Sequence, residues 1–173
     1  MEQLKIDLMA LTALETPLEW ELDDDFFAAL DDAQLKSGSL HVSGSIRKAS
    51  GFYELALSAT GTVQVPCDRC LDMMAQPIEA TLTLTVKQGT AQSPADDDTV
   101  YVDERDGILD LAWPLYESIA LAVPIQHVHQ PGECNVLMSE KLRQLSAARS
   151  SDADAQEEID PRWQALRKLV INN

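Results

Sequence analysis

The sequence predicts an α+β domain built on an antiparallel, curved sheet. Three observations lead to this prediction. Long segments between residues 39 and 86 alternate apolar and polar side chains, which is the pattern of half-buried strands. Short turns join these segments, so we expect sequential strands to pair as a meander. An apolar segment at 111–122 predicts a helix buried against the sheet.

The elements before residue 39 are expected to be short. Residues 4–8 and 18–22 each alternate in hydropathy, which predicts two strands. Phe26, Phe27 and Leu30 follow an acidic run at 23–25. Because acidic residues favour a helix N-terminus, we predict a short helical turn there.

The central strands are the clearest elements in the sequence. A turn at 48–51 ends in glycine and predicts a hairpin between the first two of them. Residues 78–86 form the cleanest alternating segment, and residues 100–102 predict an additional edge strand. Gly44 and Gly61 lie inside the strand segments, where glycine indicates a bulge or a close approach of two backbones.

The helix at 111–122 is apolar nearly all round, so we expect it to be buried. Asp110 is the predicted N-cap, and Pro114 is tolerated because it falls near the first turn. The expected contacts join four helix residues to four strand residues: Trp113, Tyr116, Ile119 and Leu121 to Leu55, Leu57, Leu82 and Leu84.

The chain length and composition favour one main domain, which we place at residues 1–138. Residues 139–160 are predicted to be a polar linker with the composition of a disordered segment. Residues 161–173 are predicted to hold a C-terminal helix, near 161–171. Asp160 is its expected N-cap, and Pro161 occupies its first position.

The charge of the chain restricts its partners. Thirteen basic and 29 acidic residues give a formal net charge of −16. Nucleic-acid phosphates repel such a polyanion, so direct rRNA contact is disfavoured and a basic protein is the expected partner. Acidity that serves only solubility is the simpler alternative. The N-terminus lacks the pattern of a signal peptide, and no apolar run approaches the roughly 20 residues that span a membrane. We therefore expect a cytoplasmic protein with no membrane contact.

Cys67 and Cys70 have the spacing of half a zinc site. The chain has only three cysteines, so a closed zinc site would need Cys134 and a histidine, either His129 or His127. A redox pair is disfavoured, because a strand-like segment and not a helix follows the motif. Two reduced cysteines in a tight turn are the remaining alternative. The expected cofactor is therefore none or zinc.

Nothing in the sequence is typical of an enzyme. It has no glycine-rich phosphate loop, no nucleophile elbow and no His-Glu-x-x-His motif. Cys134 near His127 and His129 suggests a nucleophile pair, but no oxyanion hole or orienting group accompanies it. We predict a non-enzymatic protein without a small-molecule substrate.

The predicted C-terminal helix is the expected partner-binding segment. It gathers cations of this acidic chain next to apolar residues, so it can dock on a partner or on its own sheet. The candidate partner-binding residues are Arg162, Trp163, Leu166, Arg167 and Lys168.

Several of these motifs, in this order, resemble the YceD family, whose members are associated with accumulation of large-subunit ribosomal RNA. The similar segments are Val65–Leu71, Leu109–Leu111 with Glu117, Leu121–Ile125, His129, Cys134 and Asp160–Leu169. Some relatives carry a second cysteine pair near Cys134, where this chain has one cysteine.

The resemblance implies a cytoplasmic, non-enzymatic factor in 23S rRNA accumulation or large-subunit assembly. Its expected partner is a ribosome-assembly component or a basic ribosomal protein. The alternative is a small zinc-binding RNA-contact module. In that alternative Arg69, Arg162, Arg167 and Lys168 would meet phosphates.

Overall fold

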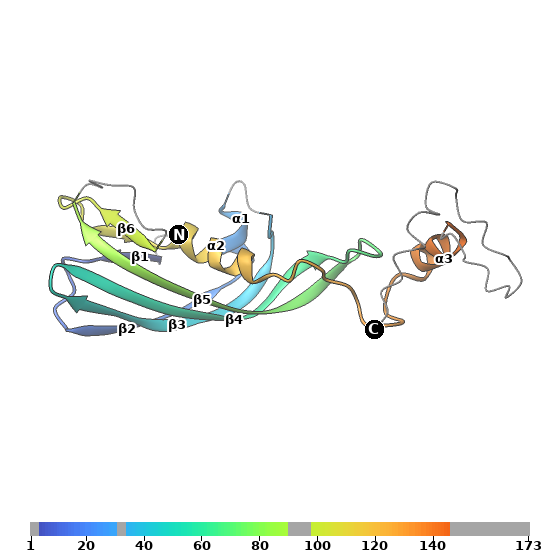
Figure 1. Ribbon diagram of the computed structural model, residues 1–173, viewed down its shortest axis with the longest axis horizontal. Coiled ribbons are helices and arrows are strands. Elements are labelled where there is room, and N and C mark those ends of the chain that lie inside the picture. The colour runs from blue at the N-terminus through green and yellow to red at the C-terminus, as the bar shows by residue number, and fades with distance from the viewer. Residues whose placement is uncertain (1–3, 31–33, 90–97, 146–173) are drawn as a thin grey trace, which may run out of the picture. The chain divides into compact units, whose positions relative to one another are not determined.

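A curved sheet of five strands forms the framework of the protein (Figure 1). The computed structural model describes residues 4–30, 34–89 and 98–145. The strand order is β2-β3-β4-β5-β6. The strands are β2 (Glu15–Leu22), β3 (Gly38–Ala49), β4 (Phe52–Pro66), β5 (Met73–Gln88) and β6 (Thr99–Val102).

The pairing confirms the predicted antiparallel meander. β2, β3, β4 and β5 pair antiparallel in sequence order. The strand expected at 100–102 is β6, which lies at the edge of the sheet and runs parallel to β5. The α+β class predicted from the sequence is therefore confirmed.

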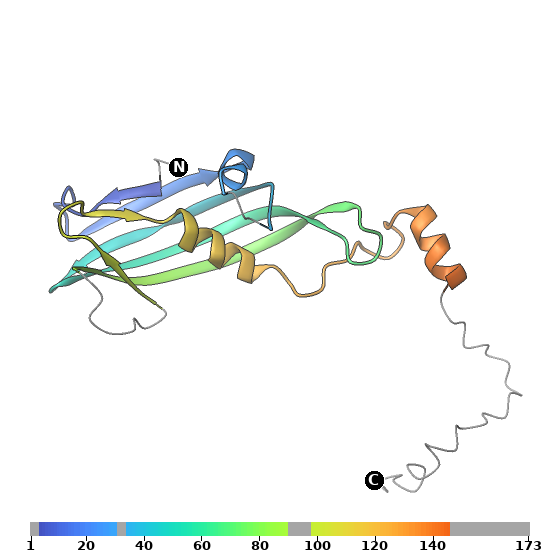
Figure 2. The same cartoon turned by 90° about the horizontal axis from the view of Figure 1, so that it is seen from above.

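A pair of short strands and two helices cover one face of the five-stranded sheet (Figures 1 and 2). β1 (Lys5–Asp7) pairs antiparallel with β7 (Ile108–Asp110). The helices are α1 (Asp24–Ala28) and α2 (Ala112–Ala122). The predicted turn at Phe26 is thus α1, and the Asp23 carboxylate caps it by accepting from the Asp25 backbone N–H at 3.1 Å.

The core lies between the covered sheet face and α2. Strand side chains such as Val42, Leu55 and Val86 are fully buried, and so are Leu115 and Ile119 of α2. Their alternation with exposed neighbours follows from the two-residue period of a strand. The pattern of the sequence therefore places the core on the predicted face of the sheet.

The expectation that α2 is buried against the sheet was wrong for two of the four residues expected to make the contact. Tyr116 and Ile119 are buried, but Trp113 is 48% exposed and Leu121 is 86% exposed. Leu82, expected opposite, is only half-buried. A helix on one face of a sheet contacts it with one side only, so apolar composition all round did not identify the buried side.

The start of α2 also differs from the expectation. The N-cap is Leu111, which makes no side-chain capping bond. Asp110 is the last residue of β7 instead. Its carboxylate still accepts a hydrogen bond from the Ala112 N–H, at 3.0 Å. Pairing with β1 keeps Asp110 extended, and the helix therefore begins later.

Gly44 and Gly61 mark close approaches of two backbones, as the sequence predicted. A Cβ atom at Gly44 would meet the carbonyl oxygen of Ala56 on β4, and one at Gly61 would meet that of Ser39 on β3. Both glycines lie on the β3–β4 pair. Their lack of a side chain lets these two long strands pack closely.

The chain divides into two units, residues 1–139 and 140–173. Helix α3 (Val136–Leu145) spans the boundary, so residues 139–145, which the sequence analysis assigned to a polar linker, are helical. The rest of the predicted linker and the predicted helix at 161–173 lie outside the described residues. In the part that the structure describes, no helix combines the length and apolarity needed to span a bilayer.

Candidate metal centre

The Cys-x-x-Cys motif forms a tight turn between β4 and β5. The Cys67 backbone N–H donates to the Asp72 carbonyl at 2.8 Å, and the Leu71 N–H donates to the Cys67 carbonyl at 2.9 Å. The Arg69 N–H points to the Cys67 sulfur, at 3.4 Å. Leu71 takes a left-handed backbone conformation, with φ of 66°. This turn directs both thiols to one side.

The segment after α2 is tied to this turn by Asp68. The Asp68 N–H donates to the His127 carbonyl at 2.9 Å, and the Asp68 carboxylate accepts from the His127 N–H at 2.8 Å. Farther along, the Asn135 side-chain amide donates to the Asp72 carboxylate at 3.1 Å. These bonds hold the segment that follows α2 against the β4–β5 turn (Figure 2).

Four side chains converge between the turn and this segment: Cys67, Cys70, His129 and Cys134. Their ligand atoms all lie within 4.8 Å of one another. The Cys70 sulfur lies 3.3 Å from His129 Nδ1, and the Cys134 sulfur lies 4.0 Å from both Cys67 Sγ and His129 Nδ1. Tetrahedral zinc with Zn–S bonds near 2.3 Å spaces its sulfurs by about 3.8 Å. The group therefore has the composition and spacing of a closed zinc site.

The surroundings of Cys67 favour its thiolate, which is the form of cysteine that binds a metal. Cys67 and Cys70 are buried, whereas Cys134 and His129 are half-buried. Burial raises the pKa of Cys67, but backbone N–H groups of Cys70, His129 and Arg69 outweigh it and lower that pKa to about 6. Burial and the neighbouring thiols raise the pKa of Cys134 to about 11. A metal cation would favour the thiolate at both positions.

The structure distinguishes between the two candidate histidines. His129 joins the thiols, whereas His127 is directed elsewhere. Its Nδ1 lies 3.1 Å from the Pro124 carbonyl, and its Nε2 lies 3.5 Å from the Asp68 carboxylate. The remaining candidate site residues, from Arg162 to Lys168, lie outside the described residues.

Sequence reasoning missed the residues that hold the cluster together. Asp68 lies between the two cysteines of the motif and Asp72 follows them, and both bind the segment at 127–135 through hydrogen bonds. A signal was present for Asp68, because a carboxylate inside a tight turn can accept from backbone N–H groups. The partners of both aspartates lie some sixty residues away, and no local pattern indicates that pairing.

The fold and the cluster define an acidic α+β protein with a Cys3His group of the kind that binds zinc. The family model described as "Large ribosomal RNA subunit accumulation protein YceD" matches residues 55–170, which is more than half of the chain. The chain therefore belongs to the YceD family, as its motifs indicated. All four residues of the cluster lie inside the matched region. Comparisons with curated proteins and with solved structures gave no match.

Proposed function

We propose that this protein is a non-enzymatic factor in 23S rRNA accumulation and large-subunit assembly, and that it acts by binding a basic protein. Its membership of the YceD family supports a role in rRNA accumulation. The net charge of −16 supports binding to a basic protein. Twenty-nine carboxylates attract a basic partner and repel bare RNA phosphates. A basic ribosomal protein or assembly factor has the required charge.

In this proposal the Cys3His cluster has a structural role. Zinc held by Cys67, Cys70, Cys134 and His129 would add four bonds to the contact between the β4–β5 turn and the segment after α2. Because such a site is closed, it leaves no position for a substrate. The site then stabilises the fold, and the partner is bound elsewhere.

The proposed process can be tested in cells of the source organism. We expect removal of the gene to lower the ratio of 23S to 16S rRNA and the full-length chain to restore it. A Cys67→Ser, Cys134→Ser variant should restore the ratio only in part, because it lacks two thiol ligands. An unchanged ratio after gene removal would contradict the proposal.

A second candidate function is a zinc-binding RNA-contact module. It is supported by Arg69, an exposed cation in the Cys-x-x-Cys turn itself. In that case the rRNA and not a protein holds the factor on the particle. Ribonuclease treatment distinguishes the two functions, because only an RNA contact is lost when the RNA is degraded.

A further inference from the structure

β2 is an edge strand whose outer side has no strand partner among the described residues. The Lys48 N–H donates to the Leu14 carbonyl, and this bond fixes which residues face β3. In an antiparallel ladder such pairs alternate, so the backbone groups of Glu15, Glu19 and Glu21 point away from β3. Pro17 also points away from β3, so its missing N–H breaks no hydrogen bond within the sheet. The outer side can therefore accept another strand.

The two faces of β2 differ in chemistry. The side chains of Glu15, Glu19 and Glu21 are exposed on the outer face of the sheet. Leu18 and Trp20 lie on the opposite face, half-buried against the core. An added strand would therefore meet carboxylates with every second side chain and apolar groups with the side chains between them.

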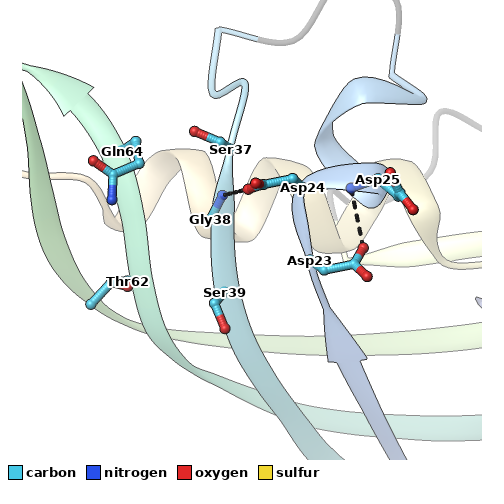
Figure 3. Close-up of a pocket in the computed structure, with 8 residues that line it drawn as sticks. All are labelled: Asp23, Asp24, Asp25, Ser37, Gly38, Ser39, Thr62 and Gln64. Carbon is cyan, nitrogen blue, oxygen red and sulfur yellow. Dashed lines mark hydrogen bonds between the residues drawn. The ribbon is translucent and has the colours of Figure 1, made fainter.

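The acidic surface continues past the end of β2. Residues 15–25 contain six acidic and no basic residues. Asp23, Asp24 and Asp25 line a pocket of about 500 Å³ beside the first residues of β3 (Figure 3). Ser37, Ser39, Thr62 and Gln64 complete its polar lining. A long cationic side chain at one end of an added strand fits the charge and polarity of this pocket.

We propose that the outer edge of β2 binds an extended segment of a basic protein as an additional strand. The segment alternates basic and apolar residues, with its cations over Glu15, Glu19 and Glu21. Backbone hydrogen bonds hold the added strand on β2. The carboxylates on one face and the apolar side chains on the other determine which sequences bind. This inference rests on the proposed function and locates the contact with the basic partner.

The negative charge of β2 also disfavours pairing with the β2 strand of a second copy of this chain. Two β2 strands placed edge to edge would bring their carboxylates together, and like charges on paired strands are unfavourable. The same carboxylates attract a basic strand. The edge therefore rejects self-association while it accepts the partner.

Binding of an alternating Lys–Val peptide, matched to the eight residues of β2, tests the proposal. Two N-methylated forms of the peptide separate strand pairing from charge attraction. One form carries the methyl groups on the lysine amides and the other on the valine amides. Their charge is equal, but only one set of amides faces β2 in a paired strand.

We expect the two forms to differ in affinity by roughly tenfold or more, because several backbone hydrogen bonds are lost in one of them. Antiparallel pairing predicts that lysine methylation is the damaging change. Hydrogen exchange should show new protection at the Glu19 and Glu21 amides. Equal affinities of the two forms, or unchanged exchange at these amides, would overturn the proposal.

A charge-reversal pair provides the matched control in the protein. Glu19→Lys with Glu21→Lys should weaken binding of the unmethylated peptide roughly tenfold, because two attractive contacts become repulsive. Glu79→Lys with Glu117→Lys changes the net charge equally, away from the edge, and should have a much smaller effect. Equal losses in both variants would contradict a specific edge.

Capture of the chain from cells distinguishes failure of the edge proposal from failure of the proposed function. If ribonuclease-treated cells still yield a basic ribosomal protein but neither peptide form binds, the edge proposal is wrong and the proposed function stands. If no basic protein is captured, the proposed function itself fails. If the edge variant alone loses the captured protein, both are supported.

Discussion

The turn that carries Cys67 and Cys70 ends at Leu71, which takes an unusual backbone conformation. Its φ of 66° lies in the left-handed region, which is unfavourable for a residue with a Cβ atom. The position directly follows Cys70 and closes the turn through the bond from its N–H to the Cys67 carbonyl. Its side chain is 68% exposed, so packing does not compensate for the strain.

Leu71→Gly should therefore raise the free energy of unfolding, by about 0.5–1 kcal/mol, because glycine adopts this conformation without strain. Chemical denaturation measures the change. Met73→Gly is the control, since it removes an exposed side chain from an ordinary strand position and should destabilise the fold. A destabilised Leu71→Gly variant would show that the leucine side chain has a role of its own.

The two histidines give a second prediction at the scale of single residues. His129→Ala should lower zinc affinity strongly, because it removes one of four ligands. His127→Ala should leave zinc bound, because the backbone of residue 127 keeps both hydrogen bonds to Asp68. Elemental analysis of the two purified variants and of the wild type measures the difference. Equal zinc content in both variants would mean that His129 is not a ligand.

The sequence could suggest the ligands but could not choose between the histidines. Cys67 and Cys70 are identified by their spacing, and Cys134 is the only remaining cysteine. His127 and His129 are both near Cys134 in sequence, and local pattern does not separate them. The choice depends on Asp68, which binds the backbone of residue 127 and directs His129 to the thiols.

Among the helices and strands, α2 has two apolar residues close in sequence whose burial differs most clearly. Ile119 is fully buried and Leu121, two positions later, is 86% exposed. Ile119→Ala should cost about 2–5 kcal/mol through lost burial and a residual cavity. Leu121→Ala should change stability by less than about 0.5 kcal/mol. Thermal or chemical unfolding of the two variants measures both values, and similar losses would place the helix in a different rotation.

The strands were more predictable than the helices, for a physical reason. Alternation in β3, β4 and β5 identifies a buried face, because a strand has a two-residue period. In α2 nearly every residue is apolar, so its buried side depends on how the sheet meets it. β7 is three residues long and forms by pairing with β1, a contact more than a hundred residues apart in the chain. Local pattern carries no signal for such a pair.

Across the whole molecule, the dominant property is its negative charge. A net charge of −16 gives the protein long-range attraction for basic partners, and salt weakens this attraction. The chain belongs to a family described by its role in accumulation of the large ribosomal RNA subunit. The proposal that the protein acts by binding a basic protein follows from this charge.

Capture of the tagged chain from its own cells, with and without ribonuclease treatment of the lysate, shows whether the bound partner is a protein or the rRNA. We predict that a basic ribosomal protein or assembly factor stays bound after the RNA is degraded and is released when the salt concentration is raised. Capture from cells expressing the chain with Glu19→Lys and Glu21→Lys provides the internal comparison. Loss of every ribosomal component on ribonuclease treatment would contradict the account, because the rRNA would then be what the protein binds.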